Sequence, residues 1–332
     1  MKALRTHEVG GPDTLTLDEV ETPTPGKGQV LVDVKACAIN YPDTLMIRDL
    51  YQFKPERPYA PGGEISGVIA ELGEGVCGWK VGDRVIAMLG NGGLAEQVAV
   101  EAARLFAIPD GVDFPTAASI LMTYGTTIHG LKDRGDIAEG QTVLVLGAAG
   151  GVGLSAVELA KAYGARVVAA VSSEEKAEVA RKAGADEVVI YPTGDIDKDA
   201  SKELAGQFKV AVGPQGADIV YDIVGGAYSE PALRSLAWEG RHLVIGFPAG
   251  IPKIPLNLTL LKSCDIRGVF WGAFTAREPE KNRQNIAELF DLLAAGKINP
   301  LVSETFPLEK GGEAIAKLEN RQAIGKLVVT MD

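Results

Sequence analysis

A glycine-rich segment in the middle of the chain has the residue types that bind a nucleotide pyrophosphate. An apolar run at residues 142–146 leads into the segment GAAGGVG at residues 147–153. Gly150 lets the backbone approach the phosphates because it has no Cβ, and Gly153 lets the next helix pack close to the strand. The first turn of that helix offers free N–H groups and the positive end of the helix dipole. With Ala148 in place of the usual first glycine, the pattern A-x-G-x-x-G predicts a dinucleotide site. Its backbone contacts are expected from Ala149, Gly150 and Gly151.

The sequence around this segment has the order strand, helix, strand that such a site requires. A helix is predicted over residues 154–163 and a second strand over residues 166–171. A transmembrane span is excluded, because the segment contains Glu158 and lacks a long uninterrupted apolar run. The alternative interpretation is a tight strand-to-helix turn in an α/β domain that binds no ligand.

The residues after the second strand select between the two nicotinamide cofactors. Sites that prefer NAD carry Asp or Glu there to bind the ribose hydroxyls, whereas this chain has Ser172 and Ser173, followed by Lys176. Hydroxyls and an ammonium group suit the 2′-phosphate of NADPH, which a carboxylate would repel. Glu174 and Glu175 argue the other way, but they lie one turn into the next helix and can point to solvent. We therefore favour NADPH, with Ser172 and Lys176 as contacts; the alternative is that Lys176 is an ordinary surface lysine.

The composition is typical of a soluble globular protein with two domains. The chain has 332 residues, of which 46% are hydrophobic and 23% charged, and its net charge is −11. This charge argues against nucleic acid or an anionic membrane surface as the main partner. The N-terminal residues lack an apolar signal core, and the three cysteines (Cys37, Cys77 and Cys264) are far apart and odd in number. Both features favour a reducing, cytoplasmic location with most or all of the cysteines buried.

The distribution of strand and helix patterns predicts an α/β protein with two kinds of domain. Residues 1–123 contain short strands, such as 29–36 and 67–71, between Gly and Pro turns, which indicates a β-rich, barrel-like domain. Residues 124–270 alternate strand and helix, which predicts a doubly wound parallel sheet. Residues 271–332 are expected to return to the first domain. The expected elements are a helix at 117–131, strands at 142–146, 166–171, 187–190, 217–222, 240–245 and 265–271, a helix at 283–295 and a strand at 324–330.

Several motifs, spread in order along nearly the whole chain, resemble the medium-chain dehydrogenase/reductase superfamily. They are Asn40-Tyr41-Pro42-Asp43, PGGEISG at residues 61–67, GDRV at 82–85, TYGTT at 123–127, AAGGVG at 148–153 and GAD at 184–186. Within the superfamily the chain is similar to the zinc-independent quinone oxidoreductases, the group that includes zeta-crystallin. The resemblance implies a GroES-like barrel domain and a Rossmann domain that binds NADPH. It also implies a homodimer in which the strand at 265–271 pairs across the interface.

The chain departs from the zinc alcohol dehydrogenases of the same superfamily at their metal-ligand positions. By resemblance, Asn40 stands where those enzymes have a catalytic Cys, and Gly63 where they have a His. Their structural zinc lobe needs four closely spaced cysteines, and residues 89–93 contain none. Zinc sites need three or four Cys, His or carboxylate ligands, whereas the histidines of this chain are scattered, at His7, His129 and His242. We therefore expect no metal, and without a Lewis acid the reduction of an activated acceptor is favoured over alcohol oxidation.

The resemblance also assigns roles around the cofactor. It places Asn40 and Thr127 beside the nicotinamide, and Val152 against the nicotinamide or the adjoining ribose. It implies that Lys176 and Tyr191 contact the 2′-phosphate; the alternative is that Tyr191 only ends a strand. It implies that Gly246, Phe247 and the backbone from Phe270 to Gly272 hold the carboxamide. It also implies that the basic residues Arg321 and Lys326 lie close to the cofactor; the alternative for Arg321 is that it is a solvated helix residue.

Two tyrosines are candidates for the proton donor of a hydride-transfer reaction. Hydride addition to a quinone, or to the β-carbon of an enone, pushes negative charge onto a carbonyl oxygen, which needs a donor and then a proton. The candidates are Tyr41 and Tyr51, with Arg48 as a charge partner. The alternatives are that these rings only line the substrate site and that water supplies the proton. The acceptor is predicted to be a quinone or an α,β-unsaturated carbonyl compound, and a non-catalytic NADPH-binding protein is the alternative from another class.

Overall fold

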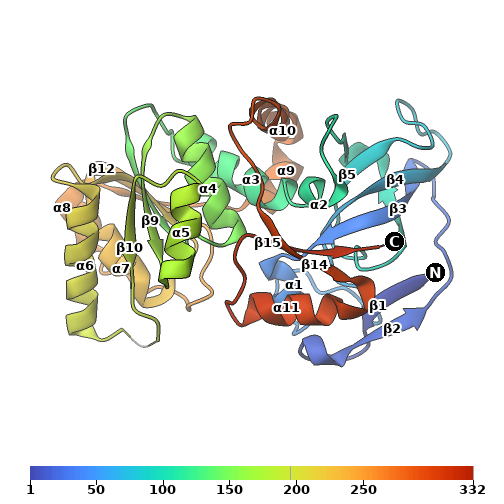
Figure 1. Ribbon diagram of the computed structural model, residues 1–332, viewed down its shortest axis with the longest axis horizontal. Coiled ribbons are helices and arrows are strands. Elements are labelled where there is room, and N and C mark those ends of the chain that lie inside the picture. The colour runs from blue at the N-terminus through green and yellow to red at the C-terminus, as the bar shows by residue number, and fades with distance from the viewer. Residues whose placement is uncertain (195, 332) are drawn as a thin grey trace. The chain divides into compact units, whose positions relative to one another are not determined.

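The computed structural model describes residues 1–194 and 196–331 and divides into two compact units. Unit 1 comprises residues 1–122 together with the chain from residue 300 onward, and unit 2 comprises residues 123–299. In Figure 1 the N-terminal strands, in blue, and the C-terminal segment, in red, belong to the same unit.

Unit 1 is built on a seven-stranded sheet that is mostly antiparallel. The strands of the whole unit are β1 (Lys2–Thr6), β2 (Leu15–Glu19), β3 (Gln29–Ala38), β4 (Glu64–Leu72), β5 (Arg84–Met88), β6 (Gln97–Glu101), β7 (Leu105–Ala107), β14 (Val302–Pro307) and β15 (Lys326–Thr330). The helices of the unit are α1 (Tyr41–Met46), α2 (Phe114–Ala117) and α11 (Gly311–Glu319). The sheet has the order β14-β15-β3-β4-β5-β7, and β6 pairs with β3 outside this path, while β1 and β2 form a separate pair. Val30, Val32 and Val34 alternate along β3 and point into one buried core.

Unit 2 is a doubly wound α/β domain. Its strands are β8 (Thr142–Leu146), β9 (Arg166–Val171), β10 (Glu187–Ile190), β11 (Ala217–Asp222), β12 (Leu236–Val244) and β13 (Asp265–Gly268). Its helices are α3 (Leu121–Ile128), whose first two residues belong to unit 1, α4 (Gly151–Ala162), α5 (Glu174–Lys182), α6 (Lys198–Val212), α7 (Ser229–Leu233), α8 (Asn257–Lys262), α9 (Trp271–Arg277) and α10 (Pro279–Ala294). The six strands are parallel and follow the order β10-β9-β8-β11-β12-β13.

Helices pack on this sheet along its central strands β8 and β9, which are mostly apolar. Leu144 and Val168 lie in one core cluster with Phe208 of α6 and Leu233 of α7, and α4 and α5 contact β9 as well (Figure 1). Strands covered in this way read as continuous apolar runs. The strand order turns back between β8 and β11, which is the point where doubly wound sheets bind their ligands. The predicted doubly wound parallel sheet is thus confirmed.

The helix predicted at residues 117–131 is interrupted. Helix α2 ends at Ala117, and α3 begins at Leu121. The backbone N–H of Met122 donates to Glu64 Oε1 at 2.9 Å, so a carboxylate from β4 caps the start of α3. Periodicity along the sequence does not reveal such a cap, because the capping side chain comes from a strand that is distant in sequence.

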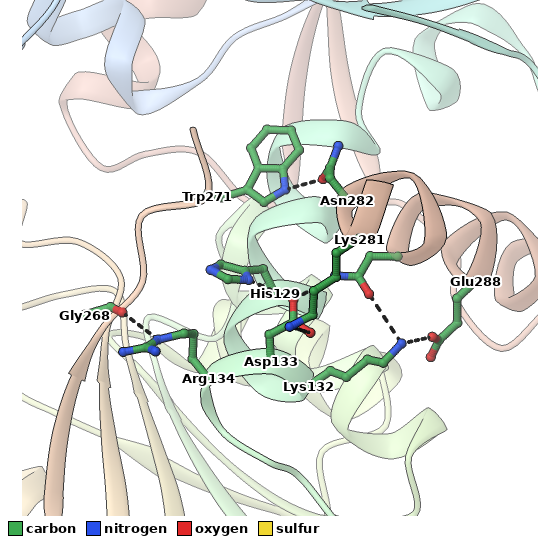
Figure 2. Close-up of polar contacts among 10 residues, drawn as sticks. His129, Lys132, Asp133, Arg134, Gly268, Trp271, Lys281, Asn282 and Glu288 are labelled. Atoms are coloured by element: carbon green, nitrogen blue, oxygen red, sulfur yellow. Dashed lines mark hydrogen bonds and ion pairs between the residues drawn. The ribbon is translucent and has the colours of Figure 1, made fainter. Parts of the chain in front are cut away.

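The return to unit 1 comes later than expected, at residue 300 instead of Trp271, because α9 and α10 belong to unit 2. In Figure 2, one contact joins α9 to α10, and another joins α10 to Asp133 in the rest of unit 2. Trp271 Nε1 donates to Asn282 Oδ1 at 3.0 Å, and Lys281 pairs with Asp133 at 3.2 Å. These contacts join residues that the strand and helix patterns alone do not connect.

The predicted strand at 265–271 is also shorter than expected, since β13 ends at Gly268 and helix α9 begins at Trp271. The indole of Trp271 lies so close to Gly125 that a Cβ there would be 2.7 Å from the ring. This inward packing of Trp271 ends the extended conformation before residue 271.

Candidate functional site

The glycine-rich loop between β8 and α4 has tight backbone packing on one side and open space on the other. A Cβ at Gly153 would lie 2.1 Å from the carbonyl oxygen of Gly147 and 2.7 Å from the Cα of Ala148, so glycine is needed there. At Gly150, the nearest atom that a Cβ would meet is 3.7 Å away. Gly150 is the N-cap of α4, and the first N–H groups of a helix have no intrahelical acceptor. An anionic group therefore fits at this helix N-terminus. Of the other predicted contacts in the loop, Ala149 is buried, and Gly151 and Val152 are partly exposed.

Ser172 and Lys176 lie together at the carboxyl end of β9, the strand next to β8. The Lys176 ammonium donates to Ser172 Oγ at 3.1 Å, and both residues are partly exposed. Glu174, the first residue of α5, pairs with Arg181 at 2.7 Å, so its negative charge is countered along the helix. A hydroxyl and an ammonium group in this place suit a phosphate monoester.

Tyr191 follows β10 and lies next to the end of β9. Its N–H donates to the carbonyl oxygen of Val171 at 2.9 Å. Its ring packs against Tyr228 with the centroids 5.0 Å apart, and the residue is 8% exposed. The fold therefore brings Tyr191 to the strand end that carries Ser172, although most of its ring belongs to the core of unit 2. Its contact with a 2′-phosphate stays a prediction.

The loops after β11 and β12 lie at the same edge of the sheet as the glycine-rich loop, because all these strands are parallel. Phe247 is 51% exposed, and its backbone lies so close to Gly225 that a Cβ there would be 2.6 Å from the Phe247 Cα. The N–H of Gly246 lies 3.4 Å from the carbonyl oxygen of Asp222. After β13, Phe270 and Gly272 are exposed. Their predicted contacts with a nicotinamide carboxamide remain predictions.

Thr127 is fully buried, and its hydroxyl is engaged within unit 2. Its Oγ1 lies 2.7 Å from Ser155 Oγ and 3.0 Å from the Tyr221 hydroxyl. These contacts join α3 to α4 and β11. The role predicted for Thr127 beside the nicotinamide would therefore be exerted through the position of α3 and not through a free hydroxyl.

In unit 1, a buried network holds the side chain of Asn40. Lys326 Nζ donates to Asn40 Oδ1 at 2.6 Å and to the carbonyl oxygen of Ile39 at 3.1 Å, and it lies 3.6 Å from Glu64 Oε2. Asn40 Nδ2 in turn donates to the same Glu64 oxygen at 2.9 Å. All three side chains are buried. Lys326 is therefore an internal partner of Asn40 and Glu64, and the cofactor contact that the resemblance implies for it stays a prediction.

Two further titratable groups, Asp43 and Cys37, are buried in the same region. Asp43 accepts hydrogen bonds from the backbone N–H groups of Asn40 at 2.8 Å and Gly62 at 3.1 Å. Burial raises the pKa of Asp43 to about 6, against the effect of these hydrogen bonds. Burial also raises the pKa of the Cys37 thiol, and the charges of Asp43 and Glu64 add to this shift. A thiol with a raised pKa is a poor nucleophile at neutral pH, so Cys37 serves as a small apolar residue.

The candidate proton donors Tyr51 and Tyr41 both remain neutral phenols at neutral pH. Burial raises the pKa of Tyr51, and the charge of Asp43 raises it further. Tyr41 is 38% exposed; burial raises its pKa, Arg321 lowers it and Glu319 raises it, with a net upward shift. Each phenol therefore carries a proton that it could donate.

Arg48, predicted to be the charge partner of a tyrosine, pairs in the structure with Glu319 instead. Its Nε and Nη2 donate to the two carboxylate oxygens of Glu319 at 2.6 and 3.0 Å. This two-pronged ion pair joins the segment after α1 to α11, and Glu319 is the charged partner of Arg48. Arg321 follows α11, is exposed and has a φ of 59°. Glycine is preferred at that position of a helix end, and the cofactor contact of Arg321 stays a prediction.

Each of the three histidines is paired with an aspartate. The distances are 2.8 Å for His7 and Asp18, 2.8 Å for His129 and Asp133, and 3.1 Å for His242 and Asp222. In the described parts of the chain, no group of three or more His, Cys, Asp or Glu residues could hold a metal ion. The histidines are therefore engaged in separate pairs.

The cysteines are free thiols, and they differ in exposure. Cys37 and Cys264 are buried, whereas Cys77 is exposed. Within residues 1–194 and 196–331, no helix has the length and apolar character that a membrane crossing needs.

Comparison with known proteins assigns both units to one family. Residues 26–110 match the family described as alcohol dehydrogenase GroES-like domain, and residues 151–294 match the family described as zinc-binding dehydrogenase. A quinone oxidoreductase-like protein 2 homolog from Nematostella vectensis is 36% identical over 99% of this chain and 88% of its own length. The chain belongs to the quinone oxidoreductase family of medium-chain dehydrogenases/reductases.

Two solved structures match this chain over its whole length. A mycobacterial protein complexed with NADPH is 32% identical, with a TM-score of 0.91 over 100% of both chains. The quinone oxidoreductase of Escherichia coli, also complexed with NADPH, is 28% identical, with a TM-score of 0.90 over 100% of both chains. These matches confirm the predicted family and the predicted fold class, a GroES-like domain with a Rossmann domain.

Two buried polar clusters were not predicted from the sequence. One is the pairing of Lys326 with Glu64 in unit 1, and the other joins Asp222, Ser229 and His242 in unit 2. The available signal was a charged or polar residue at the end of, or within, an otherwise apolar strand. Such a signal marks a residue that needs a partner, but it does not say which one.

Proposed function

We propose that this chain is a zinc-independent, NADPH-dependent reductase that transfers a hydride to a quinone. The observation that carries the proposal is the contact between Ser172 and Lys176 at the strand end beside the glycine-rich loop. A hydroxyl and an ammonium group there favour NADPH over NADH, since the 2′-phosphate distinguishes the two. The names of relatives in the quinone oxidoreductase family support the acceptor class, and the two relatives solved with NADPH support the cofactor.

In this proposal, the residues of unit 2 bind and orient the cofactor. The N-terminus of α4 receives the pyrophosphate, where Gly150 leaves space for it. Ser172 and Lys176 bind the 2′-phosphate, and the loop with Gly246 and Phe247 binds the carboxamide. NADPH, when bound, supplies the hydride.

A second acceptor class, the α,β-unsaturated carbonyl compounds, is favoured by the state of Tyr51. Saturation of a carbon–carbon double bond requires a proton on the α-carbon after the hydride has added to the β-carbon. A phenol that burial and Asp43 keep protonated is suited to deliver it. Reduction of a quinone depends less on such a donor, because protons on oxygen exchange readily with water.

The two acceptor classes are compared by the loss of NADPH absorbance with chelator-treated protein, using an ortho-quinone and a short 2-alkenal at equal concentration. Faster turnover of the quinone is the expected result. Faster turnover of the alkenal would contradict the quinone proposal in favour of an ene-reductase. Tight NADPH binding without turnover of either compound would instead favour a non-catalytic NADPH-binding protein.

The Tyr51→Phe variant is expected to lower the turnover of the 2-alkenal by about 100-fold, because it removes the phenolic proton. The quinone rate should fall by less than about threefold, since general acid catalysis contributes less to it. Tyr41→Phe is the matched comparison, and the NADPH dissociation constant of each variant shows whether the cofactor site is intact. If neither variant slows the alkenal, water supplies the proton and the acid role of the tyrosines is wrong.

We also propose that the chain forms a homodimer through the sheet edge of unit 2. Strand β13 is the last strand of the sheet, and it pairs with β12 on one side. The helix before it leaves Leu260 80% exposed and Leu261 67% exposed, and Leu256 and Ile266 are exposed at 74% and 39%. An open strand edge beside exposed apolar side chains is typical of a surface that another chain covers.

A double variant, Leu256→Glu with Leu260→Glu, is expected to convert the dimer into a monomer, because it places charge in the apolar surface. Sedimentation velocity at micromolar protein concentration measures the change. Val210→Glu is the control, since Val210 lies on α6 and is 83% exposed, and this variant should stay dimeric. A wild-type protein that sediments as a monomer would contradict the proposed dimer.

A further inference from the structure

A buried aspartate at the end of β11 ties together the loops that follow β11 and β12. Asp222 is 1% exposed, and its Oδ1 accepts hydrogen bonds from the N–H groups of Val224 at 3.0 Å and Gly225 at 2.9 Å. Its carbonyl oxygen accepts from the N–H of Ile245 at 2.9 Å and lies 3.4 Å from the N–H of Gly246. The start of each loop is therefore held by this one residue.

The two loops also contact the residues expected to bind NADPH. A Cβ on Gly225 would lie 2.6 Å from the Cα of Phe247, and a Cβ on Gly147 would lie 3.0 Å from Val224 Cγ2. The segment after β11 thus lies between the glycine-rich loop and the loop of Phe247. Packing this tight transmits small displacements, so a shift of the segment would displace both loops.

Two side chains hold the second carboxylate oxygen of Asp222. Ser229 Oγ donates to Asp222 Oδ2 at 2.5 Å, and His242 Nε2 lies 3.1 Å from the same oxygen. Both side chains are buried. Burial alone would raise the pKa of Asp222, but the contacts with His242, Ser229 and Gly225 hold it below its usual range. Asp222 is therefore an ionised carboxylate, and the groups that donate hydrogen bonds to it fix the orientation of its side chain.

The buried position of His242 has a free-energy cost, because one of its ring nitrogens lacks a hydrogen-bond partner within the described part of the chain. Among the residues that the structure describes, His242 Nδ1 is one of the buried side-chain atoms without a hydrogen-bond partner, and such atoms are unfavourable. His242 is 2% exposed, and an apolar side chain at this buried position would avoid that cost. The benefit that remains for His242 is its contact with Asp222.

We propose that His242 and Ser229 are positioning residues for cofactor binding, which act by fixing Asp222 and, through it, the loops around NADPH. This inference rests on the proposed function, because it assigns a role to the loops that would surround the cofactor. Neither side chain contacts the cofactor in this proposal.

The His242→Phe variant is expected to bind NADPH about tenfold more weakly than the wild type, since Asp222 loses one donor to its charge. Turnover at saturating NADPH should change by less than about threefold, because no reacting group is removed. In His242→Gln, the side-chain amide can still donate to Asp222, and most of the affinity should return. Amide hydrogen exchange at Val224 and Gly225 should be faster in the Phe variant and close to the wild-type rate in the Gln variant.

The controls separate this inference from the proposed function. His7→Gln removes a histidine paired with aspartate in unit 1 and should leave NADPH affinity unchanged. If His242→Phe does not fold, Ser229→Ala removes the other donor with a smaller change of volume, and it should weaken NADPH by about threefold. Equal NADPH affinity in the wild type and the folded variants would overturn the inference, as would an equal loss in His242→Phe and His242→Gln. A wild-type protein that binds no NADPH would overturn the proposed function, and unchanged exchange at Val224 and Gly225 would then separately overturn the positioning of the loops.

Discussion

Replacing Lys176 with alanine is expected to weaken NADPH binding by about 30- to 100-fold and NADH binding by less than about threefold. The Lys176 ammonium lies 3.1 Å from Ser172 Oγ at the end of β9, where the two groups together suit a phosphate monoester. Only NADPH carries a phosphate on the adenosine ribose, so only NADPH loses a charge-assisted contact. Calorimetric titration of the protein with each cofactor measures the two dissociation constants.

Lys182→Ala is the matched control for this experiment. Lys182 is exposed at the other end of the same helix, α5, and its removal changes the net charge by the same amount. It should leave both dissociation constants unchanged. If Lys176→Ala weakened NADPH and NADH equally, the lysine would act on the helix as a whole, and its role at the 2′-phosphate would be wrong.

Replacing Lys326 with methionine is expected to lower the free energy of unfolding by about 3–5 kcal/mol. Lys326 is 5% exposed, and its ammonium is the charge opposite Glu64, which is fully buried. Methionine fills a similar volume, but it leaves the Glu64 carboxylate without its counter-charge and Asn40 Oδ1 without the donor at 2.6 Å. Urea unfolding followed by circular dichroism measures the change.

A double variant separates the effect of charge from that of packing. In Lys326→Met with Glu64→Gln, no buried negative charge remains at residue 64, so this protein should be more stable than Lys326→Met alone. Lys310→Met replaces an exposed lysine of unit 1 and should change the free energy of unfolding by less than about 0.5 kcal/mol. If Lys326→Met stayed within about 1 kcal/mol of the wild type, Glu64 would already be neutral, and the charged network would be wrong.

Four of the six strands predicted in unit 2 have the same bounds in the structure, for a physical reason. Residues 142–146, 166–171, 187–190 and 217–222 have the same bounds as β8, β9, β10 and β11. A parallel strand between two layers of helices is apolar along its length, and it ends where the chain leaves the core. Both properties are local, so one sequence is enough to find them.

The helices and strands whose observed bounds differ from the predicted ones depend on contacts with residues distant in sequence. Glu64 of β4 caps α3 at Met122, which interrupts a helix that its own sequence would continue. Trp271 packs on Gly125, which ends the extended segment after β13. In both cases a tertiary contact outweighs the local preference, since local propensities are worth less than the burial or pairing of a large or charged side chain.

By itself, the sequence determined that unit 2 has a nucleotide-type loop and that hydroxyl and ammonium groups follow the neighbouring strand. These features consist of residues close together along the chain, and their spacing specifies their geometry. Only the tertiary structure decided the partners of the buried charges, such as Lys326 with Glu64, Arg48 with Glu319 and His242 with Asp222. Each of these pairs forms because strands and helices bring distant residues within a few ångströms of each other, and spacing along the chain carries no information about that distance.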